Sequence, residues 1–207
     1  MSRSQSVQFF DEQFQRQAAS GNLILNSFEE MALPYLRGRV LDFGCGMGNL
    51  SVAAARSGCS VVALDGSSAA INHLRHRAKS ESLAIEAIQS DLRSYEISED
   101  FDAVVCIGLL MFFDCPSASR SLTSLKARVL EGGVAIINVL IEGTTYLDMF
   151  DPAGHCLFSR LELEEQFAGW NVLHSAFSDF NAPDHRLKSF ATLIAQKPIA
   201  PLVRVNI

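Results

Sequence analysis

The sequence predicts an α/β fold with a doubly wound, mostly parallel seven-stranded sheet that ends in an antiparallel β-hairpin. Short apolar runs alternate with amphipathic stretches from residue 39 to residue 167, an order typical of strands joined by crossover helices. A glycine-rich turn over residues 44–48 separates the first strand from the first of these helices. The β-like runs 171–177 and 187–195 leave no room for a helix between them, so they should pair antiparallel.

The elements of the first half follow from periodicity and from helix-capping residues. A lead-in helix is expected over residues 18–33, where apolar residues recur near helical spacing. Gly58 stops the next helix, and Ser67 or Ser68 caps the one after it. Strands are expected over residues 39–43, 60–64 and 84–89, and helices over 49–57 and 67–80.

The second half continues the same alternation. Residues 101–107 form a strong strand, and Pro116 suits the first turn of a helix that runs to Leu130. Two glycines then turn the chain into residues 134–141, which are apolar enough to be buried on both faces. Ser159 and Glu162 form a capping box for a helix over 160–167. We expect an N-terminal helical cap over residues 1–34, a main domain over 35–198 and a tail over 199–207.

Composition limits the classes of protein to consider. Of the 207 residues, 48% are hydrophobic and 19% charged, and the net charge is −6. A chain this apolar buries a core rather than staying disordered, and its acidic balance disfavours nucleic acid as a partner. No apolar run approaches the roughly 20 residues of a membrane span, and the first ten residues lack a secretion signal. Five cysteines without a CxxC pair favour reduced thiols and a cytoplasmic location.

The turn Asp42-Phe43-Gly44-Cys45-Gly46-Met47-Gly48 leaves a predicted strand and enters a predicted helix. Glycines there let the backbone pass close under a ligand, and the first turn of the helix presents free N–H groups. The spacing is GxGxG, with an acid two residues before it. Asn49 stands where the dinucleotide fingerprint GxGxxG requires its third glycine.

Two further acids follow the next two strands. Asp65 ends the second strand, 23 residues after Asp42, where a carboxylate can accept both hydroxyls of a ribose. Asp91 ends the third strand and can accept from the exocyclic amine of a purine, with the Leu92 N–H nearby as a donor. Three acids at successive strand ends therefore predict a nucleoside site at the carboxyl edge of the sheet.

With these motifs the chain resembles the class I S-adenosylmethionine-dependent methyltransferases over about residues 35–197. The glycine motif, the ribose acid Asp65, the adenine acid Asp91, the turn Glu131-Gly132-Gly133 and the closing hairpin carry the resemblance. Residues 110–113, 158–170 and 189–195 are similar to the small tellurite-resistance-type methyltransferases. The resemblance implies a Rossmann-like fold, S-adenosylmethionine as cofactor, and methyl transfer to a small acceptor with a soft nucleophile, a thiol or a metalloid oxyanion.

The resemblance also implies which residues contact the cofactor. They lie in the glycine motif, after the second, third and fourth strands, and in the N-terminal segment: Asp42, Gly44, Gly46, Gly48, Asp65, Gly66, Asp91, Leu92, Ile107, Gly108 and Arg16. The glycines would contact the methionine half. Arg16 is expected to pair with the cofactor's carboxylate.

Substrate contacts are expected from the loops after the fourth and fifth strands. Met111, Phe112, Phe113 and Tyr146 are the predicted substrate-binding residues, because an aromatic face can meet a sulfonium. The segment 142–158 is long for a compact domain and is interpreted as a lid or substrate loop. His155 within it is the preferred catalytic base, although a soft anion needs none. His185 and Arg186 are second choices, and no spacing predicts a metal site.

Two alternatives stay open. One is a methyltransferase for a larger acceptor, a carrier-bound intermediate or RNA, and the other is a protein that binds S-adenosylmethionine without turnover. Asn49 and the terminal hairpin argue against an NAD dehydrogenase. Gly108-Leu109-Leu110-Met111 stands where enzymes that methylate amino groups carry an Asn/Asp-Pro-Pro-aromatic motif. We therefore expect a small-molecule partner, no nucleic acid, no membrane, and a monomer or homodimer.

Overall fold

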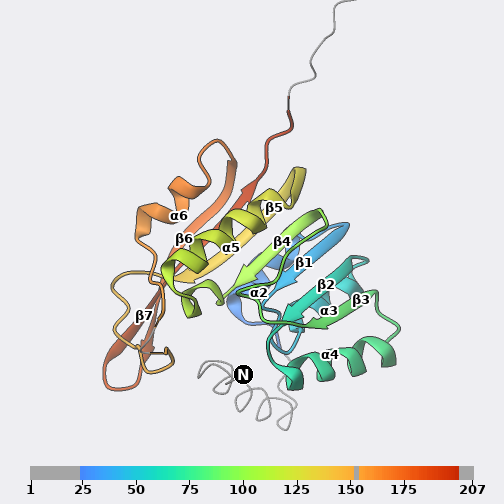
Figure 1. Cartoon of the computed structure of the whole chain (residues 1–207), viewed down its shortest axis with the longest axis horizontal. Helices are drawn as coiled ribbons and strands as arrows, with labels where there is room; N and C mark the ends of the chain where they lie inside the picture. Colours follow the sequence, from blue (N-terminus) through green and yellow to red (C-terminus); the bar gives the residue numbers. More distant parts are fainter. Residues whose placement is uncertain (1–23, 152–153, 201–207) are drawn as a thin grey trace, which may run out of the picture.

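The computed structural model describes residues 24–151 and 154–200, and seven strands within them form one sheet. The strands are β1 (Arg39–Phe43), β2 (Ser60–Asp65), β3 (Ile85–Gln89), β4 (Phe101–Ile107), β5 (Val129–Leu140), β6 (Asn171–Ala182) and β7 (Arg186–Gln196). Their order across the sheet is β3-β2-β1-β4-β5-β7-β6 (Figure 1). Strands β1 to β5 pair in parallel, whereas β7 runs antiparallel to both β5 and β6. The predicted sheet is confirmed, and its order reverses between β1 and β4, where open α/β sheets bind ligands.

Helix ends follow the capping signals in the sequence. Ser159 and Glu162 form the predicted capping box, and Ser67 caps its helix by accepting a hydrogen bond from the Ala70 N–H. An additional capping box joins Asn26 and Glu29. The helices are α2 (Ser27–Ala32), α3 (Asn49–Arg56), α4 (Ser68–Ser80), α5 (Cys115–Ala127) and α6 (Arg160–Gln166), with short 3-10 turns over Leu33–Tyr35 and Leu110–Phe112.

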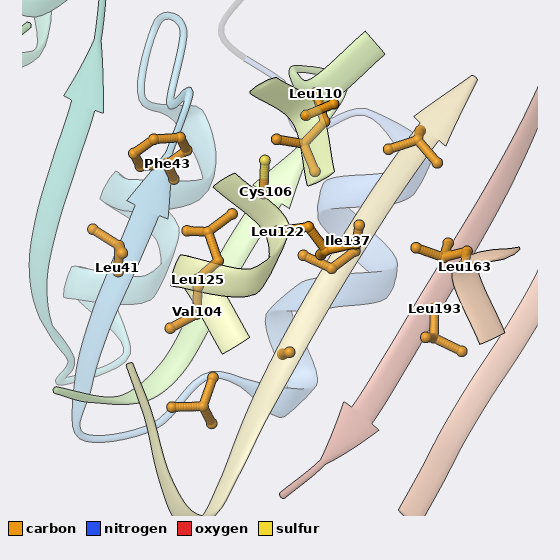
Figure 2. Packing of buried hydrophobic residues seen from close by; sticks show 14 of the residues in the cluster. Leu41, Phe43, Val104, Cys106, Leu110, Leu122, Leu125, Ile137, Leu163 and Leu193 are labelled. Atoms are coloured by element: carbon orange, nitrogen blue, oxygen red, sulfur yellow. The ribbon is translucent and has the colours of Figure 1, made fainter. Parts of the chain in front are cut away.

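Helices cover the two faces of the sheet with separate hydrophobic clusters. On one face α5 and α6 place Leu122, Leu125 and Leu163 against the sheet, as Figure 2 shows. On the other face α2, α3 and α4 contribute residues such as Ala32, Leu50 and Leu74. Side chains alternate between the faces along each strand, so every strand of the sheet centre is buried on both sides.

Several element boundaries differ from the sequence-based expectation. The lead-in helix begins at Ser27 within the described residues, and α5 ends at Ala127, so Leu130 lies in β5 and not in a helix. Strand β5 starts at Val129 because its first residue pairs with Phe101, before an irregularity in the ladder next to the glycine turn. Strand β6 continues to Ala182, since its ladder with β7 extends to Arg186.

The expectation that all five cysteines are reduced thiols is wrong for two of them. Cys115 and Cys156 form a disulfide across 41 residues of sequence, while Cys45, Cys59 and Cys106 are free and buried. Cys115 follows β4 and Cys156 follows β5, and these strands are parallel neighbours whose carboxyl ends adjoin. Sequence spacing alone does not reveal such a pair, because the sheet brings it together.

Two general findings concern the described part of the chain as a whole. None of its helices combines the length and the apolar character that crossing a bilayer requires. No group of three or more His, Cys, Asp or Glu side chains in it has a geometry that could hold a metal ion.

Candidate functional site

Main-chain hydrogen bonds join the carboxyl ends of β1, β2 and β3. The Gly44 and Cys45 N–H groups donate to the Leu64 carbonyl at 2.8 and 2.9 Å. The Ser90 N–H donates to the Asp65 carbonyl at 3.1 Å. The glycine turn, the end of β2 and the start of the loop after β3 therefore form one continuous edge, on which the predicted acids Asp65 and Asp91 lie.

Asp65 is held in a fixed orientation at this edge. Its Oδ2 accepts from the Gly46 N–H at 2.9 Å, and its Oδ1 accepts from the Ser67 N–H at 2.8 Å. The side chain is half-buried, and Gly66 beside it is also half-buried. A carboxylate oxygen can accept more than one hydrogen bond, so the chemistry of Asp65 suits the two hydroxyls of a ribose.

Packing explains why glycine is needed at two positions of the turn. At Gly44, where φ is +89°, a Cβ would lie 2.9 Å from Leu109 of the loop after β4. At Gly48, where φ is +73°, a Cβ would lie 2.5 Å from Leu74 of α4. The glycines thus let the turn sit directly against two other elements, and the same turn presents the Gly46 N–H to Asp65.

Asp42 is a buried acid on the face covered by α3. It is 5% exposed, and its Oδ2 accepts from the Ser51 hydroxyl at 2.6 Å. Burial, with smaller contributions from the charges of Glu29 and Asp65, raises the pKa of Asp42 to about 7 against the hydrogen bond from Ser51. Burial also raises the pKa of Glu29 on α2.

Asp91 and Leu92 occupy the loop after β3 in different environments. Asp91 is exposed, and its Oδ1 accepts from the Arg93 N–H at 3.1 Å. Leu92 is buried in the α5-side cluster. The Arg93 side chain donates to the Phe112 carbonyl at 3.1 Å and lies over the Phe113 ring, so it ties the loop after β3 to the loop after β4.

The end of β4 is joined to β5 at the same level. The Gly108 N–H donates to the Asn138 carbonyl at 2.9 Å, and Ile107 is paired with Asn138 in the ladder. Both Ile107 and Gly108 are half-buried. Their predicted contact with the amino end of the cofactor is compatible with this position and stays a prediction.

Next to this edge lies a second group of side chains, here called the acceptor cluster. It consists of residues from the loop after β4, the end of β5, the segment after it and β7: Met111, Phe112, Leu140, Met149, Phe150, Tyr146, Leu157 and Phe190. Met111 and Phe112 are 3% and 6% exposed, and Phe113 packs instead in the α5-side cluster. The cluster can present sulfur and aromatic surface to a ligand, and a ligand that reaches Met111 or Phe112 must displace the groups that cover them.

The segment 142–158 is fixed at several points. The Thr144 hydroxyl accepts from the Ser189 N–H at 3.1 Å, and the Thr145 hydroxyl accepts from the Leu187 N–H at 2.8 Å. The disulfide attaches Cys156 to α5. The described part of this segment is therefore a wall of the acceptor cluster that several anchors hold in place.

The predicted base and one predicted substrate residue lie on this wall. The His155 ring stacks on Phe150, with centroids 4.7 Å apart and planes 10° from parallel, and Phe150 contacts Phe112. Tyr146 is half-buried, with Arg186 and Lys188 each 4.7 Å from its ring centroid. Arg186 makes two hydrogen bonds to Asp148, which occupy its guanidinium. These positions suit a role beside an acceptor, and the assignments stay predictions.

Sequence reasoning missed four residues of this region. Ser51 and Glu29 act on Asp42, and Asn138 and Thr192 form a buried polar pair between β5 and β7. Glu29 and Asn138 could have been found in the sequence. Glu29 has capping-box spacing from Asn26, and Asn138 interrupts an apolar run. Arg16, the predicted partner of the cofactor's carboxylate, lies outside the described residues.

The residues at the edge fit S-adenosylmethionine by their chemistry. Its sulfonium and ammonium groups outweigh its one carboxylate, so it is a net cation. Among the described residues no ion pair neutralises Glu29 or Asp42. Burial raises the pKa of the Cys45 thiol well above its usual value, and the negative charges of Asp42 and Asp65 contribute to this rise. An edge with this negative potential favours a cationic ligand.

Comparisons with known proteins give a matching domain family and two curated relatives. A family model for a methyltransferase domain matches residues 40–133. The chain is 26% identical over 166 residues to a probable S-adenosyl-L-methionine-dependent methyltransferase, TehB, of Haemophilus influenzae, across 77% of this chain and 57% of TehB. It is also 26% identical over 170 residues to Hemagglutinin 1 of Eikenella corrodens, across 77% of this chain and 55% of that protein. The chain thus spans little more than half the length of these curated relatives.

A solved structure shows the same fold. The crystal structure of TehB from Haemophilus influenzae matches with a TM-score of 0.71 at 23% identity, over 84% of this chain and 62% of that one. This structure confirms the fold, and the domain match together with the TehB relative confirms the resemblance stated from the sequence and S-adenosylmethionine as the cofactor of the domain.

Proposed function

We propose that this chain, which carries a class I S-adenosylmethionine-dependent methyltransferase domain, methylates a small acceptor through a soft nucleophile, a thiol or a metalloid oxyanion. One observation carries the proposal. The edge that holds Asp65 through the Gly46 and Ser67 N–H groups meets the loop after β4 at Gly44, which lies against Leu109. The same loop continues into Met111 and Phe112 of the acceptor cluster. The proposed nucleoside site and an apolar wall of aromatic and sulfur-containing side chains are therefore neighbours, as methyl transfer requires.

The chain's own residues bind, orient and exclude water. When bound, S-adenosylmethionine supplies an electrophilic methyl group, which the acceptor's lone pair takes while the carbon–sulfur electron pair returns to sulfur. Asp65 would hold the ribose, Asp91 and Leu92 the adenine, and the turn Gly44–Gly48 the methionine half. Holding the acceptor in line contributes about 7–11 kcal/mol in well-oriented reactions, and the buried acceptor cluster excludes competing water.

A soft acceptor needs no strong base, and none is evident beside the acceptor cluster among the residues that the structure describes. A thiolate or a metalloid with a lone pair attacks without losing a proton, whereas a hydroxyl or amine needs one removed. Stacking on Phe150 covers one face of the His155 ring, the nearest candidate. The resemblance of residues 110–113, 158–170 and 189–195 to the small tellurite-resistance-type methyltransferases supports the same class of acceptor.

Calorimetric titration tests the cofactor site directly. S-adenosylmethionine and S-adenosylhomocysteine should bind in the micromolar range, about −8 kcal/mol. Asp65→Ala should abolish this binding, because the ribose loses both carboxylate contacts. Asp179→Ala is the matched control, since Asp179 is an exposed acid on β6 outside the edge, and it should bind like the wild type. Binding of NADH in place of S-adenosylmethionine would overturn the cofactor assignment.

A methyl-acceptor screen tests the substrate class. We expect turnover with small thiols, selenite or tellurite, measured as S-adenosylhomocysteine released. Inactivity with all of these beside activity on RNA would contradict the small-molecule proposal. Tight binding of S-adenosylmethionine without turnover on any acceptor would favour a binding protein instead.

A further inference from the structure

One polar atom is left unpaired in the buried centre of the sheet. Asn138 is 0% exposed, and its Nδ2 donates to the Thr192 hydroxyl at 2.9 Å. Its Oδ1 has no hydrogen-bond partner, although it is buried. Rotating the amide by half a turn pairs its oxygen with the Thr192 hydroxyl and leaves the nitrogen unpaired, so either orientation leaves one atom without a partner.

Nothing in the fold requires a polar residue at this position. Asn138 interrupts the run Val134–Ile141, in which every other residue is apolar, and a leucine has nearly the same size. A buried acceptor without a partner costs folding free energy, whereas an apolar side chain of the same shape does not. A residue that weakens the sheet in the ligand-free chain indicates a ligand that pairs with it.

The position of Asn138 indicates which ligand. Asn138 pairs with Ile107 of β4 on one side and with Thr192 of β7 on the other. The backbone carbonyl of Asn138 accepts from the Gly108 N–H at the end of β4. Two residues further along the same face, Leu140 and Phe190 are paired with each other and belong to the acceptor cluster. The amide thus lies between the turn assigned to the cofactor and the wall assigned to the acceptor.

We propose that the Asn138 amide, oriented by Thr192, binds an oxygen atom of the methyl acceptor. This inference rests on the proposed function and narrows it. A singly protonated metalloid oxyanion carries a hydroxyl that can donate to Oδ1, and its other oxygens can accept from Nδ2. A thiolate has no donor to offer an amide oxygen. Asn138 therefore selects an oxyanion over a thiol, and Thr192 is a positioning residue.

The test compares Asn138→Leu with the wild-type full chain. Because the substitution removes the unpaired atom, the melting temperature should stay the same or rise. The KM for selenite or tellurite should rise about tenfold, as expected for a lost buried hydrogen bond. The Kd of S-adenosylmethionine and the KM of a small thiol such as 2-mercaptoethanol should change less than about twofold. Selenite binding to the S-adenosylhomocysteine complex, measured by calorimetry, should weaken by the same factor as the KM.

A second pair of variants keeps the test decisive if Asn138→Leu fails to fold. Thr192→Val removes the hydroxyl that orients the amide and should raise the oxyanion KM by about threefold. Thr192→Ser keeps the hydroxyl and should restore wild-type values.

The outcomes separate two kinds of failure. If wild type binds S-adenosylmethionine and methylates oxyanions, but the Asn138 and Thr192 variants leave the oxyanion KM unchanged, Asn138 does not bind the acceptor. A wild type that methylates thiols alone overturns the inference as well. A wild type that binds no S-adenosylmethionine overturns the proposed function itself.

Discussion

The two halves of the sheet edge are held together by different kinds of interaction. Around β1, β2 and β3, backbone N–H groups make most of the connections, to the Leu64 and Asp65 carbonyls and to the Asp65 carboxylate. Around β5 and β7, side chains make many of them, through the Cys115–Cys156 disulfide, the hydroxyls of Thr144 and Thr145, and the Arg186–Asp148 ion pair. The backbone hydrogen bonds of the glycine turn need a particular backbone conformation, which few residue types adopt. A side-chain contact, in contrast, can be removed by one substitution while the others remain.

This difference suits the two proposed roles. A cofactor site has one ligand to bind, and a rigid backbone turn presents the same N–H groups to it each time. An acceptor site determines specificity, and side chains there can vary without disturbing the sheet. Substitutions in the first half should therefore affect stability and cofactor binding together, and those in the second half should change acceptor use without changing cofactor affinity.

The largest effect is expected for Gly48→Ala. Gly48 has φ of +73°, and the new Cβ would overlap Leu74 of α4. Left-handed backbone costs about 1–2 kcal/mol for alanine, and overpacking adds about 1–3 kcal/mol. The free energy of unfolding should fall by their sum, and S-adenosylmethionine binding should be lost in calorimetry.

Gly58→Ala is the matched control. Its φ is +95°, but a Cβ there meets nothing within 4 Å. We expect only the backbone cost of about 1–2 kcal/mol, with cofactor affinity retained. Equal losses in the two variants would mean that contact with α4 does not constrain the turn.

Reduction of the disulfide is expected to have the next largest effect. A cross-link that closes 41 residues contributes up to about 4 kcal/mol in the chain-entropy model. Adding dithiothreitol should lower the melting temperature of wild type and leave that of Cys156→Ser unchanged. The acceptor KM should rise, because Cys156 anchors the wall next to His155, while the Kd of S-adenosylmethionine should not change.

Cys59→Ser serves as the control for loss of a buried thiol, since Cys59 is free and lies outside the site. It should respond to dithiothreitol like the wild type. A parallel loss of cofactor affinity on reduction would show that the two halves are not independent.

Asp42→Asn should change the pH dependence of the first half. The pKa of Asp42 in the folded protein is about 7, above its value in an unfolded chain. The folded state thus holds a proton that the unfolded state releases, and the free energy of unfolding falls as pH rises from about 4 to 7. A cationic cofactor prefers the ionised acid, so its affinity should rise over the upper part of the same range.

In Asp42→Asn, both the free energy of unfolding and the cofactor affinity should depend less on pH. The amide oxygen of the variant still accepts from the Ser51 hydroxyl, but it carries no charge. If cofactor binding lowers the pKa of Asp42 by one unit, wild-type affinity changes about tenfold across the transition. Calorimetry at pH 6 and pH 8 measures this change. An unchanged slope in Asp42→Asn would assign the pH dependence to Glu29 or another group.

The sequence predicted the first half more closely than the second, for a physical reason. The strands β1 to β4 were placed within a residue, because each is an apolar run ended by Gly, Asp or Ser. The start of β5 was not, since Leu130 continues the helical pattern although it lies in β5, directly after Val129, which pairs with Phe101. Among the site residues, the glycine turn was predictable from local spacing.

The disulfide, by contrast, joins residues that the fold alone brings together. Nothing local to Cys115 or Cys156 distinguishes them from the three free cysteines. The proposed role of Asn138 likewise depends on its own side-chain oxygen staying unpaired in the fold, although its polarity in an apolar strand was visible in the sequence. Hydrophobic periodicity and sequence motifs therefore do not predict the long-range side-chain contacts of this site.

The smallest effect is expected for Asp148→Asn. Asp148 is exposed and accepts two hydrogen bonds from Arg186, and these bonds, helped by the charge of Arg186, lower the pKa of that carboxyl. Exposed ion pairs contribute little and are screened by salt. The melting temperature should fall by less than on reduction of the disulfide, and the difference from wild type should vanish at about 0.5 M salt. Arg186 stays over the Tyr146 ring without this partner, so the acceptor KM should hardly change. A loss as large as that on reduction would show that this ion pair, and not the disulfide, fixes the wall of the acceptor cluster.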